Sequence, residues 1–175
     1  MAGKSQHISD AILAKLESAR IARLATLDAQ GRPHIVPVCF VYRGSVFYTA
    51  VDGKPKSGAP EKLARLRHIA RAPPVALLID EYCEDWARLW FILVRGRAEL
   101  IGTSAHQERA RAIRPLKEKY QQYAAGMLAD DAPIIRITSE RISSWASFRN
   151  QSEGRACELS ASDTKELWFE KLPGC

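Results

Sequence analysis

The sequence lacks the cysteine patterns that bind zinc or hold small extracellular domains together. Its four cysteines, Cys39, Cys83, Cys157 and Cys175, are scattered over 175 residues without a Cys-x-x-Cys pair. Zinc ribbons and disulfide-rich domains need close, repeated spacings, so both classes are excluded. The histidines and acidic residues show no metal-ligand spacing either. We therefore expect reduced thiols and no metal site.

Several catalytic and membrane signatures are also missing. No Gly-x-Ser-x-Gly elbow, Walker loop or Gly-x-Gly-x-x-Gly pattern occurs, which removes support for the hydrolase and nucleotide-binding classes that use them. The N-terminal residues lack the apolar run of about 7–15 residues that marks a signal peptide, and no apolar stretch reaches the ~18 residues needed to span a bilayer. We expect a soluble, cytoplasmic protein without membrane partners.

The composition is that of a single folded domain. Hydrophobic residues make up 46% and charged residues 26%, and 26 Lys and Arg against 20 Asp and Glu give a net charge of +6. Disordered chains are poorer in apolar residues, and at this length about 70% of the surface is buried on folding. The core is therefore large enough without disulfides.

Periodicity predicts a mainly β, α+β chain with antiparallel strands. Strands are rich in β-branched and aromatic residues with period two, whereas helices repeat their apolar residues every three to four positions. Strands are predicted at 21–27, 35–42, 46–51, 75–79, 89–101 and 134–145, and helices at 10–18, 60–71 and 104–123, with Ser9 as an N-cap and Pro115 kinking or dividing the last helix. Short strands need their edges hidden, so we expect a small closed or partly closed barrel over 8–146, followed by a tail at 147–175.

Two local features point to a ligand. Pro37 interrupts a strand and removes a ladder donor, so this strand is an edge, a bulge or a place where the backbone faces a ligand. Residues 52–72 hold six of the basic residues, and Lys54 and Lys56 flank a proline that stiffens their loop. With the Thr49 hydroxyl they suit a phosphate; the alternative is a solvated loop that keeps the protein soluble.

Four segments carry a family resemblance. They are residues 22–28 with 31–37, Tyr48-Thr49 with 52–56, residues 63–67, and residues 84–90 leading into 96–98. With these segments the chain resembles the pyridoxamine 5'-phosphate oxidase-like split-barrel flavoproteins, most closely the branch that binds the deazaflavin coenzyme F420. The resemblance implies a six-stranded antiparallel split β-barrel of the FMN-binding type with flanking helices. It also implies a homodimer with the cofactor groove at the subunit interface.

The resemblance also implies site residues. In the family, the loop after the Tyr48-Thr49 strand binds the cofactor phosphate, which corresponds to Lys54 and Lys56, and the strand matching Val36, Pro37 and Val38 lies against the ring. Two positions depart from the family pattern. His68 stands where relatives usually carry Asn, and Leu93 stands where they carry Arg; Arg95 and Arg97 share the face of residue 93 and could substitute for it.

Three further residues are candidates, each beside a structural alternative. His34 precedes the ring strand and is a candidate proton donor, although a single His in a strand is more often half-buried packing. Trp86 and Trp90 would stack on a planar ligand or anchor a dimer, or simply fill the core.

The function implied is that of an F420-dependent oxidoreductase that moves a hydride between reduced deazaflavin and a small conjugated or unsaturated substrate. The alternatives are an FMN-dependent oxidase or reductase of the same family, and a split barrel that binds a cofactor or tetrapyrrole without turnover. A different class is a module that binds nucleic acid or an acidic partner through the basic residues Arg109, Arg111, Arg114, Lys117 and Lys119. Glu108 and Glu118 on the same helix, and the lack of interleaved aromatics, disfavour it.

Overall fold

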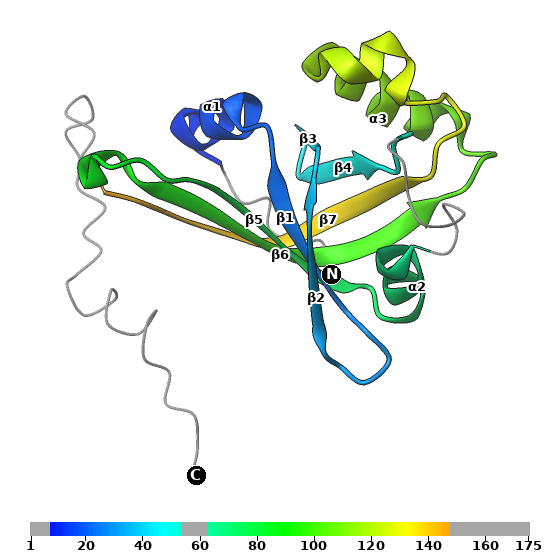
Figure 1. The fold of residues 1–175 in the computed structure, drawn as a ribbon, viewed down its shortest axis with the longest axis horizontal. Coiled ribbons are helices and arrows are strands. Elements are labelled where there is room, and N and C mark those ends of the chain that lie inside the picture. The colour runs from blue at the N-terminus through cyan, green and yellow to red at the C-terminus, as the bar shows by residue number, and fades with distance from the viewer. Residues whose placement is uncertain (1–7, 54–62, 148–175) are drawn as a thin grey trace.

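The protein folds into one curled antiparallel sheet with helices packed around it (Figure 1). The computed structural model describes residues 8–53 and 63–147. The elements in chain order are α1 (Asp10–Ser18), β1 (Ala22–Leu27), β2 (Pro33–Val38), β3 (Val41–Arg43), β4 (Val46–Ala50), α2 (Ala64–Arg71), β5 (Pro74–Glu81), the 3-10 turn η2 (Trp86–Arg88), β6 (Trp90–Ile101), α3 (His106–Lys119), the π-helical turn η3 (Tyr123–Met127) and β7 (Ile134–Ala146).

The strand order explains why the sheet curls. It runs β2-β1-β5-β6-β7-β4-β3, so β2 and β3 are consecutive in the chain but lie at opposite edges of the sheet. Only two residues, Cys39 and Phe40, separate them. The two edges must therefore approach each other, which produces a partly closed barrel. The expected mainly β split barrel with flanking helices is confirmed.

The predicted count of six strands is wrong, because the expected strand over 35–42 is divided into β2 and β3. The hydroxyl of Tyr120 binds the backbone where the strand is divided. It accepts a hydrogen bond of 2.9 Å from the Phe40 N–H, and it lies 2.9 Å from the Phe40 carbonyl and 3.0 Å from the Arg20 carbonyl. Side-chain bonds thus replace ladder bonds at the crossing. Burial is the main cause that raises the pKa of Tyr120 to about 12, whereas the hydrogen bond with the Phe40 backbone lowers it.

The expected helices are present with changed bounds. Ser9 caps α1 by accepting from the Ile12 N–H at 3.5 Å, as predicted. Residues 60–62 lie outside the described residues, and α2 begins at Ala64. Pro115 does not divide the last helix: α3 continues through it and ends at Lys119, and the separate turn η3 follows.

Two apolar clusters hold these elements together. The first lies inside the barrel and joins strand residues such as Leu24, Phe47 and Ile92 to Leu66 and Ile69 of α2. The second packs the outer side of β4 and β7 against Ile113 and Leu116 of α3 and Tyr123 of η3. The packing of α2 in the first cluster and of α3 in the second therefore holds the strands that carry the predicted site.

A bulge bends the two longest strands. Arg95 pairs with Arg141 whereas Gly96 pairs with Ser139, so β7 carries one extra residue there. A Cβ at Gly96 would lie 2.3 Å from the Thr138 carbonyl oxygen. Real side chains never approach so closely, and this close crossing explains the glycine in the Gly96-Arg-Ala98 segment.

Candidate functional site

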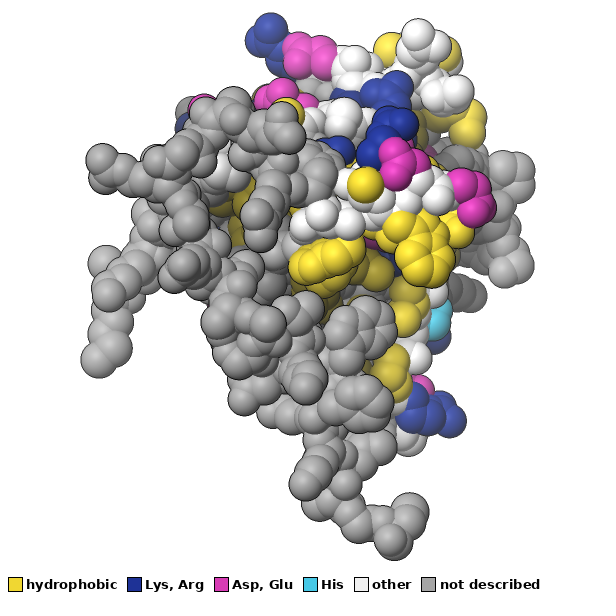
Figure 2. Space-filling model, turned by 90° about the vertical axis from the view of Figure 1, so that its left-hand side faces the viewer, with side chains coloured by type: hydrophobic (Ala, Val, Ile, Leu, Met, Phe, Trp, Pro, Cys, Tyr) yellow, Lys and Arg dark blue, Asp and Glu magenta, His cyan; other side chains and the backbone are white. Residues whose placement is uncertain are grey.

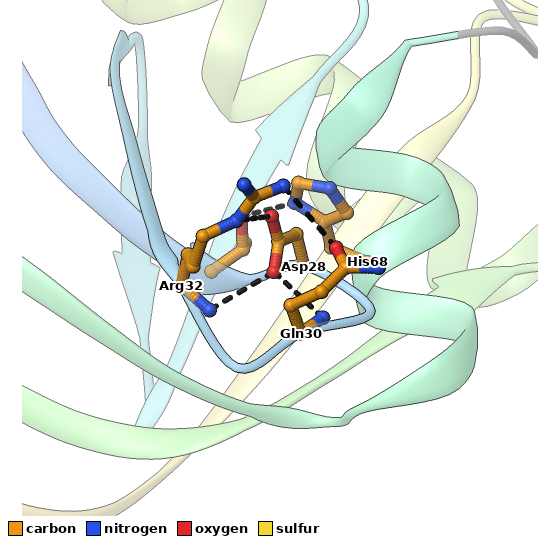
Figure 3. A network of polar contacts seen from close by, with 5 residues as sticks. Asp28, Gln30, Arg32 and His68 are labelled. Carbon is orange, nitrogen blue, oxygen red and sulfur yellow. Dashed lines mark hydrogen bonds and ion pairs between the residues drawn. The ribbon is translucent and has the colours of Figure 1, made fainter.

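The β1–β2 hairpin ends in a turn organised by Asp28 (Figure 3). Its Oδ1 accepts from the N–H groups of Gln30 and Arg32 at 2.8 and 2.9 Å, and its Oδ2 accepts from Arg32 Nε at 2.7 Å. Gly31 adopts a φ of 77°, the left-handed conformation that a three-residue hairpin loop requires. The hydrogen bonds, led by that from the Arg32 backbone, lower the pKa of Asp28 to about 2.

Directly behind this turn, three polar side chains meet. Thr26 of β1 is 1% exposed, and its Oγ1 lies 3.0 Å from Nδ1 of His68 on α2 and 3.4 Å from the His34 carbonyl. The rings of His34 and His68 meet edge to face with centroids 5.2 Å apart. We call Thr26, His34 and His68 the histidine corner.

The predicted ring strand is an edge strand. Among the strands, β2 is hydrogen-bonded to β1 alone, so Pro37 lies at the sheet edge. An edge was one of the three alternatives expected for this strand. Val36 and Val38 point inward, where Val38 is buried, and Pro37 points outward opposite Arg23. Edge strands leave alternate backbone N–H and C=O groups free to bind another chain or a ligand.

Tyr48 and Thr49 point to opposite sides of β4. Tyr48 packs in the α3 cluster with its hydroxyl 3.4 Å from Glu108, and burial, together with that carboxylate, raises its pKa. Thr49 is 1% exposed and faces the barrel side. The two residues, expected to lie together at the cofactor, are therefore not brought together by the structure.

Lys54 and Lys56 lie outside the described residues, but both stems of their loop are described. Gly53 donates its N–H to the Met127 carbonyl at 2.7 Å, and Tyr123 donates its hydroxyl to Asp52 at 3.0 Å. Asp52 also raises the pKa of Arg65 on α2, although burial lowers it more. The turn η3 and α2 thus hold the two ends of the basic loop.

The two tryptophans have different environments. Trp90 is 5% exposed; its Nε1 donates to Glu81 at 3.0 Å and Lys15 lies over its ring. It is a core residue. Trp86 is 68% exposed on η2, in the connection between β5 and β6. Figure 2 shows hydrophobic side chains exposed beside acidic ones on the face that it presents.

The outward side of the sheet carries many apolar side chains beside the ion pair of Arg23 with Asp80. Along β2, β1, β5, β6 and β7 the register brings partly or fully exposed apolar side chains onto one surface, here called the outer sheet face: Ala25, Leu27, Ile35, Pro37, Ala76, Leu78, Phe91, Leu93 and Trp145. Phe91 stacks on Trp145 with centroids 6.0 Å apart. Arg95 and Arg97 are exposed on the side of Leu93, as expected from their spacing.

Most basic residues of α3 are engaged within the protein. Arg109 is buried and donates to the carbonyls of Asp130 and Ala132; Arg114 pairs with Glu118 and Lys117 with Asp130. Lys119 donates to the Leu16 carbonyl, and burial lowers its pKa to about 8. These contacts disfavour α3 as a nucleic-acid surface.

Two cavities of the described part of the chain lie next to α3. One of about 660 Å³ is lined by residues such as His106 and Arg109, and the other, of about 250 Å³, by residues such as Val41 and Lys119. Neither is lined by a predicted site residue. No group of metal-ligating side chains occurs in residues 8–53 and 63–147, and no helix there is long and apolar enough to cross a membrane.

Thr26, Asp52 and Tyr123 are not among the predicted site residues, and His68 is predicted only as a departure from the family pattern. One feature of the sequence points to Thr26, namely a polar residue at an inward position between apolar neighbours. No sequence pattern indicates the contact of Asp52 with Tyr123, because 70 residues separate them in the chain.

Comparison with known proteins defines the class. The family model described as pyridoxamine 5'-phosphate oxidase matches residues 8–146, and the chain belongs to this family. A curated relative, the 5a,11a-dehydrotetracycline/5a,11a-dehydrooxytetracycline reductase of Streptomyces rimosus, is 29% identical over 146 residues, covering 81% of this chain and 85% of the reductase.

Solved structures share the fold. A conserved hypothetical protein from Mycobacterium tuberculosis matches with a TM-score of 0.63 and 18% identity over 89% of this chain and 98% of its own. The heme storage protein HutZ from Vibrio cholerae matches with a TM-score of 0.61 and 15% identity over 81% and 95%. An F420 reductase matches with a TM-score of 0.55 and 20% identity over 78% and 98%.

Proposed function

We propose that this protein is an oxidoreductase that uses F420, with FMN as the alternative, and acts on a small conjugated or unsaturated molecule. The observation that carries the proposal is the similarity to the tetracycline reductase over 146 residues, which cover 81% of this chain. The likeness of fold to an F420 reductase supports the choice of cofactor.

The described residues fit a bound cofactor in two respects. β2 presents an unpaired edge next to Val36 and Val38, and Nδ1 of His34 is buried without a hydrogen-bond partner among the described residues. Buried polar atoms are rarely left unpaired, so a ligand group near His34 would satisfy it. A bound flavin or deazaflavin supplies the hydride chemistry.

The protein's own part is to bind, orient and exclude water. The β2 edge would hold the ring by backbone hydrogen bonds, and Lys54 and Lys56 would hold the phosphate by charge-assisted hydrogen bonds. The Thr49 hydroxyl faces the same side as Val36 and Val38. Tyr48 lies on the other side of β4, so its contribution is to pack that strand on α3.

We further propose that two copies associate through the outer sheet face, with one ligand site between them. Ile35 is 63% and Trp145 38% exposed on this face. Exposed apolar side chains gathered on one face are characteristic of protein interfaces. Trp86 would then contribute to the interface or to the substrate site.

The test is a fluorescence titration of the purified protein with F420 and with FMN. Replacing both lysines (Lys54→Ala with Lys56→Ala) should weaken binding of the preferred cofactor by about 3 kcal/mol or more, more than a hundredfold, because each contributes roughly 1.5–3 kcal/mol. Arg111→Ala with Arg114→Ala removes the same charge from α3 and should leave the affinity unchanged. Binding of neither cofactor to the unaltered protein rejects the function.

A further inference from the structure

The histidine corner is a polar site inside an otherwise apolar wall. Thr26, His34 and His68 come from three different elements, β1, β2 and α2, while the inward positions around them are occupied by residues such as Leu24, Val36 and Ile69. Thr26 and His34 are directly opposite each other in the β1–β2 register, and the Asp28 turn closes the hairpin next to them. Rigid elements therefore hold all three side chains.

The hydrogen bonds of Thr26 determine what His68 can offer. The Thr26 hydroxyl lies 3.0 Å from His68 Nδ1 and 3.4 Å from the His34 carbonyl. The carbonyl can only accept, so the Thr26 hydroxyl donates to it, and both contacts are satisfied when His68 Nδ1 carries a proton and donates to the Thr26 oxygen. Nε2 is then the ring nitrogen of His68 that is left for a ligand, and it donates when the imidazole is protonated.

His34 supplies the second unpaired group. Its Nδ1 is buried and has no partner among the described residues, the one buried side-chain nitrogen or oxygen atom of which this holds in that part of the chain. Leaving such an atom unpaired is unfavourable. The rings of His34 and His68 touch edge to face. A ligand oxygen at the edge of the two touching rings would accept from both.

The surrounding charges favour a negatively charged oxygen. The carboxylate of Asp28 is fully engaged by Arg32 and Gln30, so it does not act as an open acceptor. The helix that carries His68 contains Arg65, Arg67 and Arg71 and no acidic residue. Positive side chains therefore outnumber negative ones on this helix.

We propose that Thr26, His34 and His68 form an oxyanion-binding site for a phosphate or carboxylate group of the ligand that binds along β2. His34 and His68 donate to the anion, and Thr26 is a positioning residue that fixes the His68 ring. In linking the site to a ligand on β2, this inference rests on the proposed function. The anion belongs either to the cofactor tail or to the substrate, and the experiments below separate the two.

The direct test is an NMR titration of the full chain with inorganic phosphate, following the imidazole nitrogens. The signals of His34 and His68 should shift together and saturate, while that of His106, exposed on α3, should not. Nδ1 of His68 should have the shift of a protonated nitrogen before phosphate is added, because it donates to Thr26. Phosphate that moves neither His34 nor His68, or moves His106 equally, overturns the site.

Variants then identify the source of the anion. His68→Leu should weaken phosphate binding about tenfold, the equivalent of one such hydrogen bond, and His68→Gln, which retains a donor near Nε2, should recover part of it. Thr26→Val keeps the shape and should give a smaller loss, with a changed Nδ1 signal of His68. His106→Gln is the matched control and should have no effect.

Paired ligands complete the assignment. If the cofactor supplies the anion, His68→Leu weakens FMN but not riboflavin, and F420 but not its chromophore without the phosphate. If the substrate supplies it, both members of each pair bind as before while inorganic phosphate still contacts the two histidines. Cofactor binding without any phosphate effect on the histidines overturns the site and leaves the proposed function standing. Phosphate binding to the two histidines without cofactor binding supports the anion site and rejects the proposed function.

Discussion

At the scale of single residues, Asp28 couples the hairpin to pH. Its folded-state pKa of about 2 lies below the ordinary value of 3.8 because the Arg32 and Gln30 N–H groups and the Arg32 side chain bind the ionised form. The unfolded chain takes up the proton first as pH falls. The stabilisation is therefore complete above pH 3.8 and is lost between that pH and about 2.

The direction of this pKa shift predicts a measurable difference in the pH dependence of stability. Urea unfolding of the protein and of Asp28→Asn should differ by a constant amount above about pH 5, and the difference should shrink as pH falls towards 2. Asp131→Asn, an exposed carboxylate in another loop, should show no such convergence. A difference that grows on acidification would contradict the assigned direction.

Residue patterns predicted some positions well and others poorly for a physical reason. The alternation along β2 and the missing backbone N–H of proline predicted a sheet edge for Pro37 as one of three alternatives, because both features depend on local backbone chemistry. Trp86 and Trp90 could not be told apart from their spacing, since the burial of Trp90 depends on Glu81 and Lys15 around it. The residues next to His68 in the sequence do not indicate its contact with Thr26.

At the scale of elements, η3 holds the stem of the basic loop. Tyr123 is 3% exposed and donates to Asp52, and Met127 accepts from Gly53. Burial is the main cause of the raised pKa of Tyr123, so the hydroxyl remains a donor throughout the neutral range. The turn thus fixes the direction in which the chain leaves β4 towards Lys54.

Tyr123→Phe removes the hydroxyl that contacts Asp52 and Cys39. We expect a loss of about 1 kcal/mol in the free energy of unfolding. We also expect weaker binding of phosphate-bearing cofactors than of their phosphate-free counterparts, because the loop loses its orientation. Tyr82→Phe, at a position 67% exposed, is the control and should change neither quantity. Equal weakening of both kinds of ligand would show that η3 does not act through the loop.

The division of the strand over 35–42 shows why elements are harder to predict than residues. Its apolar run is continuous in the sequence, and no breaker occurs at Cys39 or Phe40. The break follows from a hydroxyl 80 residues away that binds the Phe40 backbone. Likewise, Pro115 did not end its helix, because α3 is held by the packing of Ile113 and Leu116 beside it.

At the scale of the whole molecule, the proposed dimer depends on the outer sheet face. Ile35 lies on the edge strand and makes this face apolar at its margin. Ile35→Lys should convert a dimer to a monomer at micromolar concentration, measured by sedimentation, without loss of the folded state, since the side chain is already exposed in the single chain. Leu100→Lys, 42% exposed elsewhere on β6, should sediment like the unaltered protein. A stable monomer of the unaltered protein would reject the shared site.

The place of β7 in the sheet has a consequence for how the chain is made. β7 is the last strand in the chain, yet it lies between β6 and β4, and Tyr120 closes the crossing between β2 and β3. During synthesis the first four strands therefore emerge without the neighbour that joins them into one sheet. Such long-range pairing slows folding and leaves strand edges open to aggregation. A protein shortened before Ile134 would lack the strand that joins β6 to β4, so fragments ending there are poor starting points for separate domains.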